Sequence, residues 1–206
     1  MAIAQEPCVA SSNCFESSTE SQLLRLYGGP RTRATIIQWH LEELDVPYQY
    51  ISLDLSKDEH RQPEYLEINP IGKVPAIVDQ DFILWESGAI LIYLAEKYAQ
   101  EDVPLETRAQ FNQWVLFANA TLGPGLFNPE RREREIPRLL PPLNQILQKQ
   151  PFLMGEELTV ADIAVASYLY YAVRLLSLDF KDYPAVEQYL DKLSMRPAFQ
   201  KTLGQR

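Results

Sequence analysis

The spacing of hydrophobic positions changes about halfway along this chain. Up to residue 98, short apolar runs alternate with stretches in which apolar residues recur every three or four positions. After residue 99, only the second kind of spacing continues. Short apolar runs bounded by turn residues indicate strands, whereas a spacing of three to four indicates amphipathic helices. The pattern therefore predicts an α/β unit followed by an all-helical unit.

Seven elements are expected in the first unit, in the order strand, helix, strand, helix, strand, strand, helix. The strands are expected at Leu23–Tyr27, Tyr48–Leu53, Ala76–Val78 and Phe82–Leu84, and the helices at 32–45, Pro63–Ile68 and Ser87–Tyr98. This order is that of a thioredoxin-like domain, a small mixed sheet with helices on both faces. We assign residues 22–98 to this domain, 99–104 to a linker and 105–206 to an all-helical domain.

Proline and glycine complicate the helical half. A helix is expected over residues 105–122, ended by Gly123-Pro124-Gly125. The limits of any helix within 129–150 stay open, because Pro137, Pro141 and Pro142 would each remove an interior hydrogen bond. Two further helices are expected near 184–193 and 196–203.

The segment Thr159-Val-Ala-Asp162 gives the sharpest local signal. A threonine followed three positions later by an acidic residue, with apolar Leu158 and Ile163 beside them, indicates a capping box with a hydrophobic staple. The helix that it opens, Val160–Leu176, is apolar almost all round and is expected at the centre of the helical half. The motif is interpreted as structural.

Composition and charge exclude several classes of function. The net charge of -9 argues against nucleic acid as a partner. The chain has no run of 18 apolar residues, the length that would indicate a membrane span. Cys8 and Cys14 lie in residues 1–21, which lack basic residues and an apolar core, so no signal peptide is expected. We interpret this segment as a disordered tail or as the product of an upstream start, and we expect a cytoplasmic protein. His40 and His60 are too few for a metal site and are expected on the surface.

The candidate binding site is the segment Asn69-Pro70-Ile71-Gly72-Lys73-Val74-Pro75, followed by a strand and then by Glu86-Ser87. A Val-Pro step before a strand can leave a backbone edge unpaired beside a helix N-terminus. An unpaired edge accepts a peptide as an added strand, and a helix N-terminus favours anions. The combination suits a small anionic peptide.

Together with other motifs, this segment resembles the cytosolic glutathione S-transferases. The resemblance rests on Leu26-Tyr27 before a Gly/Pro turn, Arg-x-Arg-Ala, Asn-Pro-x-Gly-Lys-Val-Pro, Trp-Glu-Ser-x-Ala-Ile and the Thr-x-x-Asp box, and it covers about residues 22–206. Within the family it is nearest to bacterial members such as the chi class. The resemblance implies a homodimer with a glutathione-binding N-terminal domain and a helical domain that binds a small apolar electrophile.

The resemblance also implies roles for the site residues. Val74-Pro75 would be a cis bond that exposes the Val74 backbone to the cysteinyl backbone of glutathione. Ser87 and the helix N-terminus would hold the γ-glutamyl carboxylate, and Glu86 its ammonium group. Lys73 could reach the glycyl carboxylate. Three alternatives stay open: Ser87 is simply an N-cap, Glu86 is an ordinary acidic residue of the first helical turn, and Lys73 is a solvated lysine.

The enzyme must present glutathione as a thiolate, because the thiolate is the nucleophile. Lowering a thiol pKa near 8.5 by roughly 2 units requires about 2.7 kcal/mol. No cysteine lies where the first strand meets the first helix, and Gly29 stands where related enzymes have serine. We assign the leading part to Arg33 and Thr32, a supporting part to Tyr27 and a ligand contact to Arg31. Alternatively, Tyr27 is buried in the sheet, Thr32 only caps the helix, and both arginines point into solvent.

The electrophile is less well defined by the sequence. Trp114, Phe117, Tyr168 and Tyr171 could line an apolar pocket or belong to the core. Isothiocyanates, haloaromatics, hydroperoxides and enones are all candidates, and the class resemblance favours isothiocyanates. A non-catalytic binding protein of the same fold is the alternative function. A thiol-disulfide reductase is disfavoured by the missing active-site cysteine.

Overall fold

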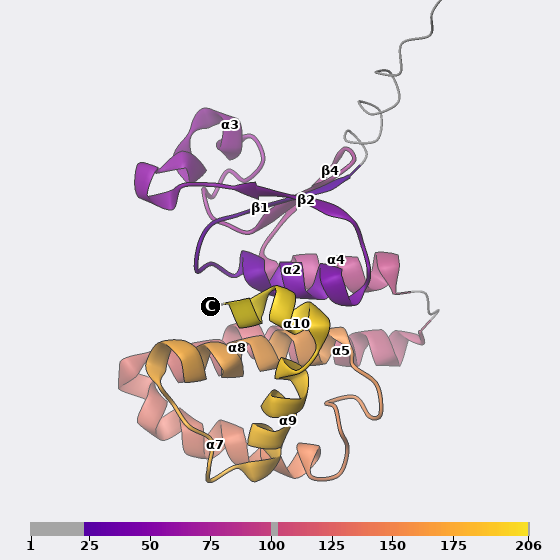
Figure 1. The fold of residues 1–206 in the computed structure, drawn as a ribbon, viewed down its shortest axis with the longest axis vertical. Coiled ribbons are helices and arrows are strands. Elements are labelled where there is room, and N and C mark those ends of the chain that lie inside the picture. The colour runs from indigo at the N-terminus through magenta and orange to yellow at the C-terminus, as the bar shows by residue number, and fades with distance from the viewer. Residues whose placement is uncertain (1–22, 100–102, 206) are drawn as a thin grey trace, which may run out of the picture.

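The computed structural model describes residues 23–99 and 103–205. An α/β half and a helical half lie against each other along one broad face (Figure 1). The predicted tail, residues 1–21, lies outside the described residues, and so does the centre of the predicted linker at 99–104.

The first half is built on a four-stranded sheet in the order β2-β1-β3-β4. Its strands are β1 (Leu24–Gly28), β2 (Tyr48–Ser52), β3 (Ala76–Asp79) and β4 (Phe82–Trp85). β1 is parallel to β2 and antiparallel to β3, and β3 and β4 form an antiparallel hairpin. The expected hairpin is confirmed.

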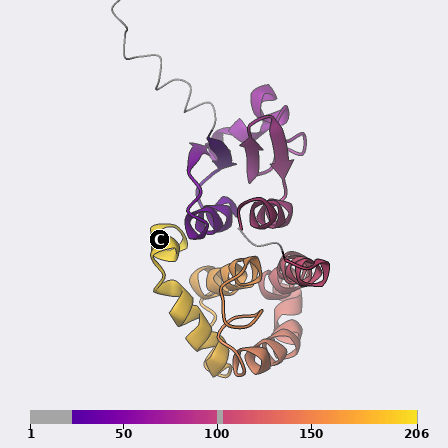
Figure 2. The ribbon, with the colours of Figure 1, turned by 90° about the vertical axis from the view of Figure 1, so that its right-hand side faces the viewer.

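Helices lie on both faces of this sheet. They are α2 (Ala34–Glu43), α3 (Pro63–Leu66) and α4 (Ser87–Tyr98), with 3-10 turns at Leu55–Lys57 and Glu59–Arg61. α2 and α4 cover the face towards the helical half, and α3 lies on the far side (Figures 1 and 2). The thioredoxin-like fold predicted from the order of elements is confirmed.

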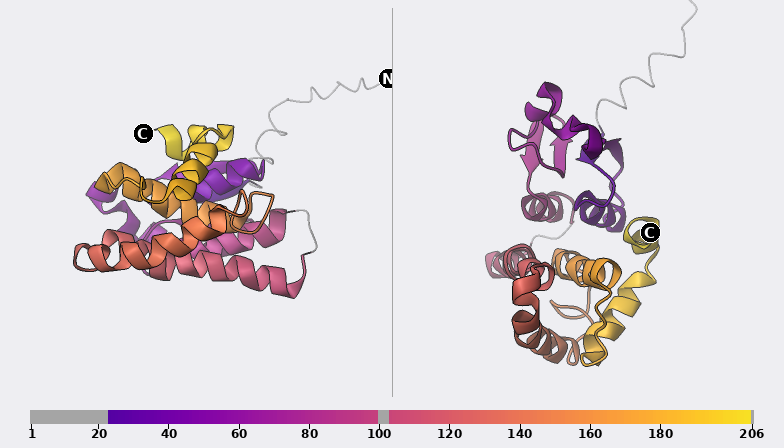
Figure 3. Two further views of the ribbon diagram at one scale, coloured as in Figure 1. Left: turned by 90° about the horizontal axis from the view of Figure 1, so that it is seen from below. Right: turned by 90° about the vertical axis from the view of Figure 1, so that its left-hand side faces the viewer.

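Over its described residues, the second half consists of helices and connecting segments, with one isolated bridge between Phe152 and Gly155. Its elements are α5 (Leu105–Phe117), a π-helix η3 (Ala118–Leu122), α6 (Gly123–Phe127), α7 (Pro129–Leu147), α8 (Val160–Leu176), α9 (Pro184–Ser194), α10 (Pro197–Lys201) and a final 3-10 turn (Leu203–Gln205). α8 lies on the side of this half that faces α2 and α4 (Figures 1 and 3). None of the helices within 23–99 and 103–205 is long and apolar enough to cross a membrane.

One expectation about proline and glycine was wrong, and the structure answers a question that the sequence left open. Gly123-Pro124-Gly125 does not end the helical path, because Pro124 lies in the first turn of α6, where no backbone N–H is needed. α7 also runs unbroken through its three prolines. Pro137 and Pro142 are exposed, so water can bond the carbonyls that they leave free. Buried Leu140 and Leu143 anchor the opposite face.

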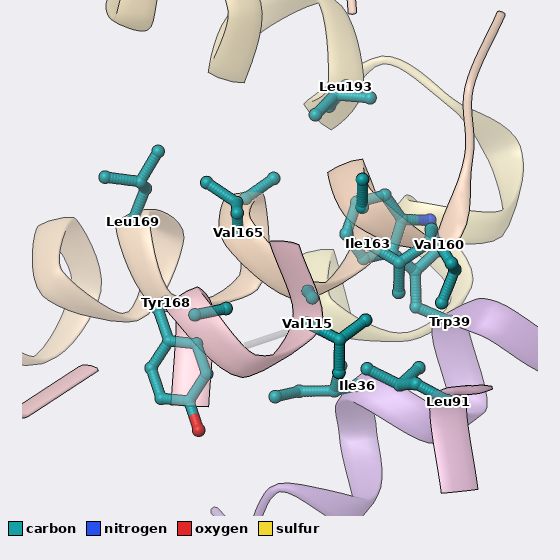
Figure 4. Close-up of a cluster of buried hydrophobic side chains, with 14 of the residues drawn as sticks. Ile36, Trp39, Leu91, Val115, Val160, Ile163, Val165, Tyr168, Leu169 and Leu193 are labelled. Atoms are coloured by element: carbon teal, nitrogen blue, oxygen red, sulfur yellow. The ribbon is translucent and has the colours of Figure 1, made fainter. Parts of the chain in front are cut away.

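The capping box and the helix that it opens are confirmed. The Thr159 hydroxyl accepts from the Ala161 N–H at 3.3 Å, and Asp162 Oδ2 accepts from the Thr159 N–H at 2.9 Å. α8 then lies at the centre of a core that spans both halves of the molecule. Its apolar side chains, including Val160 and Ile163, lie close to Ile36 and Trp39 of α2 and Leu91 of α4 (Figure 4).

The expectation that both histidines lie on the surface was wrong for His40. Its side chain is on the inner face of α2 and only 4% exposed. Burial lowers the pKa of this imidazole to about 4, and the Leu91 backbone acts in the opposite direction. His60 is half-buried.

Candidate functional site

The ends of three strands meet at one edge of the sheet. Tyr27, near the end of β1, pairs with Ala76, the first residue of β3, and Ala76 pairs with Trp85, the last residue of β4. Pro75 and Glu86 therefore lie next to each other at this edge, with the turn after β1. Both α2 and α4 begin here, so two helix N-termini, which favour anions, face the same edge.

The loop before β3 is held in shape by buried side chains. The Val74-Pro75 bond is cis, as the resemblance implied. The Lys73 carbonyl accepts from the Tyr65 hydroxyl at 2.6 Å and from Asn69 Nδ2 at 2.7 Å. Val74 lies just before the strand ladder, which starts at Ala76, and the Lys73 side chain is exposed. The sequence motif included Asn69, but its role as a loop support and that of Tyr65 were missed.

The chain turns sharply between β4 and α4. Glu86 has a φ of 73° and occupies the N-cap position, so its exposed carboxylate lies beside the helix N-terminus. Ser87 is the first residue of the helix rather than its N-cap, and it is only 1% exposed. Its hydroxyl donates to Asn119 Oδ1 at 3.2 Å. A residue expected to bind ligand is thus joined to the helical half.

Asn119 brings together side chains from four helices. Besides Ser87 of α4, its Oδ1 accepts from the Tyr168 hydroxyl of α8 at 2.9 Å and from Arg33 Nη1, at the start of α2, at 3.4 Å. Arg33 Nη1 also lies 3.5 Å from the Tyr168 hydroxyl. Asn119 itself lies in the π-helix η3, a local distortion that is frequent at functional sites. Sequence reasoning missed Asn119, because only the fold brings it to this turn.

The other candidate residues near the turn between β1 and α2 differ in what they contact and in how exposed they are. The Thr32 hydroxyl donates to the Gly29 carbonyl at 2.8 Å and accepts from the Ala34 N–H at 3.3 Å, so its proton is engaged within the turn. Arg31 is exposed with a φ of 58°. The half-buried Tyr27 ring lies 5.8 Å from that of Tyr65. Of the two arginines, only Arg33 is held between the halves.

The aromatic residues proposed for a second substrate fall into two pairs. Tyr168 contacts Arg33, and the Tyr171 hydroxyl donates to the Thr32 carbonyl at 3.4 Å, so both reach the site. Trp114 and Phe117 form an edge-to-face pair at 5.6 Å and pack against the core. Over the residues that the structure describes, no group of His, Cys, Asp or Glu side chains could hold a metal ion.

The fold and the site together define a class of protein. Proteins of this class have a thioredoxin-like domain in which an open backbone segment and two helix N-termini meet at one sheet edge. A helical domain borders this site on one side. Family models for the N-terminal and the C-terminal domain of glutathione S-transferases match residues 22–96 and 128–197. The chain belongs to the glutathione S-transferase family.

Individual relatives agree with this assignment. The chain is 35% identical to the disulfide-bond oxidoreductase YfcG of Escherichia coli, in an alignment covering 85% of this chain and 92% of the relative. It is 31% identical to glutathione S-transferase F9 of Arabidopsis thaliana, covering 80% and 88% of the two chains.

Solved structures match over similar lengths. The transferase URE2P6 of Phanerochaete chrysosporium, in complex with oxidized glutathione, superposes with a TM-score of 0.78 at 32% identity, covering 91% of this chain and 97% of that one. A family member from Pseudomonas fluorescens, with two glutathione bound, gives a TM-score of 0.76 at 30% identity, with coverages of 88% and 92%.

Proposed function

We propose that this protein is a glutathione transferase that conjugates the glutathione thiolate to small apolar electrophiles. One observation carries the proposal: the Val74 backbone, the Glu86 carboxylate and the start of α4 meet at a single sheet edge. The cysteinyl backbone pairs with Val74, and the γ-glutamyl carboxylate lies at Ser87 and the helix N-terminus. Glu86 accepts from the ammonium group, and Lys73 reaches the glycyl carboxylate.

Arg33 is the principal group that stabilises the thiolate in this proposal. It is the cation that Asn119 and Tyr168 hold at the beginning of α2, where a positive charge opposes the helix dipole unless an anion is present. Thr32 donates to the sulfur once its proton leaves the Gly29 carbonyl. Tyr27, on β1, has a supporting part in stabilising the thiolate. Arg31 contacts the ligand from its exposed position in the turn.

The electrophile binds between this turn and the helical half, beside Tyr168 and Tyr171. The assignment to the chi-like members, with isothiocyanates as the favoured substrates, is supported by Gly29 and by the lack of a cysteine in the turn. We further propose a cytoplasmic homodimer. Phe82 and Ile83 of β4 and Leu116 of α5 are exposed apolar side chains that association of two copies would cover.

The proposal is tested by titrating the protein with glutathione and following thiolate absorbance against pH. We expect saturable binding and a bound thiol that titrates below the free value, since the thiolate is held by a cation and hydrogen bonds. Absence of saturable binding would contradict the assignment. Binding with an unshifted thiol would instead support the alternative, a non-catalytic binding protein.

The Arg33→Ala substitution is expected to raise the pKa of the bound thiol by about one unit, equivalent to about 1.4 kcal/mol. Tyr27→Phe should raise it less, because Tyr27 is not part of the Asn119 cluster. The same absorbance titration measures both, with Arg25→Ala on an exposed β1 position as the matched control. The reverse ranking would transfer the activating role to the tyrosine.

A second candidate function is reduction of small disulfides by two molecules of glutathione. It is favoured by the similarity to a disulfide-bond oxidoreductase and to a structure with two glutathione bound. In this reaction glutathione supplies both thiols, so the missing cysteine is no obstacle. Two glutathione molecules give up two electrons and two protons, which convert the substrate disulfide to two thiols and leave glutathione disulfide. Parallel assays with bis(2-hydroxyethyl) disulfide and an isothiocyanate distinguish the two activities.

A further inference from the structure

Asn119 reaches the candidate site from the helical half. It lies in the π-helix η3, and its side chain is half-buried. Its amide nitrogen Nδ2 donates to the Val115 carbonyl at 2.9 Å, about one turn earlier in the chain. The opposite orientation of the amide would place Nδ2 against the guanidinium of Arg33, which has only donors. The amide oxygen Oδ1 is therefore the atom that faces the start of α2.

This single oxygen joins the beginnings of the two helices that border the sheet edge. It accepts from Nη1 of Arg33, the residue before α2, at 3.4 Å, and from the hydroxyl of Ser87, the first residue of α4, at 3.2 Å. The Tyr168 hydroxyl donates to the same oxygen at 2.9 Å. Since that hydroxyl has only one proton, it can meet Arg33 Nη1, 3.5 Å away, only as an acceptor. Arg33 is thus held by oxygens of two residues from the helical half.

Two glycines allow the backbones to come close enough for these contacts. A Cβ atom on Gly88 of α4 would lie 3.2 Å from Asn119 Nδ2, which is closer than an ordinary side-chain contact. A Cβ atom on Gly123 of α6 would lie 2.7 Å from the Tyr168 ring. A larger residue at either position would force a shift of its neighbour. The positions of Asn119 and Tyr168 are therefore fixed by close packing against glycine backbone.

The groups that hold Arg33 are uncharged. Over residues 23–99 and 103–205, no carboxylate forms an ion pair with its guanidinium. An amide oxygen and a phenol hydroxyl can fix the position of a guanidinium without cancelling its charge, whereas a carboxylate would do both. The cation therefore stays available to an anion that binds at the start of α2.

We propose that Asn119 is a positioning residue for the glutathione thiolate. Its neutral oxygen holds Arg33 at the start of α2, and it fixes that start relative to Ser87 and α4. The inference rests on the proposed function, because it takes glutathione to bind at this edge and Arg33 to stabilise the thiolate. Asn119 contacts neither the sulfur nor the peptide, so it acts on the pKa of the thiol only through Arg33. A residue of the helical domain thus contributes to activation of the thiol bound by the other domain.

The first test replaces Asn119 with alanine and follows thiolate absorbance against pH at saturating glutathione. Asn119→Ala releases the Arg33 side chain, so the pKa of the bound thiol is expected to rise by about half a unit. In the Arg33→Ala background the same substitution should raise it by less than about 0.2 units, because the group through which it acts is missing. The matched control is Asn112→Ala in α5, about two turns earlier and outside the cluster, which should leave the pKa unchanged.

Three further variants separate positioning from other effects. Asn119→Leu keeps the branched shape of the side chain but removes both polar groups, so it should raise the thiol pKa as much as alanine does. Ser87→Ala removes the contact to α4 and leaves the contact to Arg33, so it should weaken glutathione binding about fivefold without raising the thiol pKa. Thr159→Ala, outside the cluster, tests whether a loss of stability alone changes the pKa, and no change is expected.

Circular dichroism and thermal melting establish that each variant is folded, and Asn119→Leu replaces Asn119→Ala in the comparison if the alanine variant is not. The inference is overturned if the folded Asn119 variants leave the thiol pKa of the unmodified protein unchanged, or if their effect persists in full in the Arg33→Ala background. The proposed function would survive either result. Absence of glutathione binding, or an unshifted thiol, in the unmodified protein would contradict both.

Discussion

Replacing Asp162 with alanine is expected to lower the free energy of unfolding by about 3–5 kcal/mol. This carboxylate is fully buried and accepts four hydrogen bonds. Oδ1 accepts from the Leu153 N–H at 2.8 Å and the Tyr189 hydroxyl at 3.0 Å. Oδ2 accepts from the N–H and the hydroxyl of Thr159 at 2.9 and 3.1 Å. The substitution leaves the buried Leu153 N–H without this partner and leaves the Tyr189 hydroxyl with only the Asp162 carbonyl at 3.5 Å, in the centre of the helical half.

Two companion variants make the measurement specific. Thr159→Ala removes the N-cap hydroxyl and its bond to Asp162 Oδ2 but keeps the bonds of Oδ1, and it is expected to cost about 1 kcal/mol. Asp191→Ala, at an exposed position of α9, should change the stability very little. Urea unfolding followed by circular dichroism gives the three values. If Asp162→Ala cost no more than Thr159→Ala, the bonds to Leu153 and Tyr189 would carry no energetic weight.

Acidification from pH 6.5 to pH 4 is expected to remove up to about 3 kcal/mol of stability through His40 alone. Burial lowers the pKa of the folded imidazole to about 4 from an ordinary value of 6.5. Between these values the unfolded chain binds a proton that the folded protein does not, so stability falls as the pH falls. The contribution is fully present above pH 6.5 and is lost as the pH drops towards 4.

The pH dependence is isolated by comparing variants. In His40→Phe the stability should fall less steeply with acidification over this window, whereas His60→Phe should keep the slope of the unmodified protein. Glu43, Glu96, Arg108 and Glu157 line a cavity that His40 also lines, and they are unchanged in both variants, which therefore differ only in the histidine that is removed. Equal slopes for His40→Phe and the unmodified protein, from urea unfolding at several pH values, would refute the assignment.

The features that the sequence predicted correctly are those encoded by neighbouring residues. The order of strands and helices and the capping box at Thr159 follow from patterns within a few positions. His40 could have been predicted as buried, because it stands three residues after Ile37 and four before Leu44, on the apolar face of α2. Its polarity led to the wrong expectation.

The parts that the sequence could not predict depend on long-range contacts. Arg33 and Asn119 are 86 positions apart, and Arg33 and Tyr168 are 135 apart. No local pattern indicates that the domain interface joins them. The course of α7 was left open for another reason. An interior proline leaves one backbone carbonyl without its hydrogen bond, and the cost is small where water can reach that carbonyl. Whether water can reach it depends on which face of the helix is buried, and the sequence alone did not decide this.

The position of α10 has a consequence for synthesis of the chain. The ring of Phe199 packs edge-on against Trp39 at 5.1 Å, and Lys201 bonds to Glu42 at 2.6 Å. The first half of the chain leaves the ribosome early, yet the outer face of its α2 is covered by residues such as Lys201, which is made 159 positions after its partner Glu42. Until those residues have been made, this face must stay exposed or be held by a chaperone. A nascent chain stalled before residue 196 would therefore be a sensitive target for proteolysis.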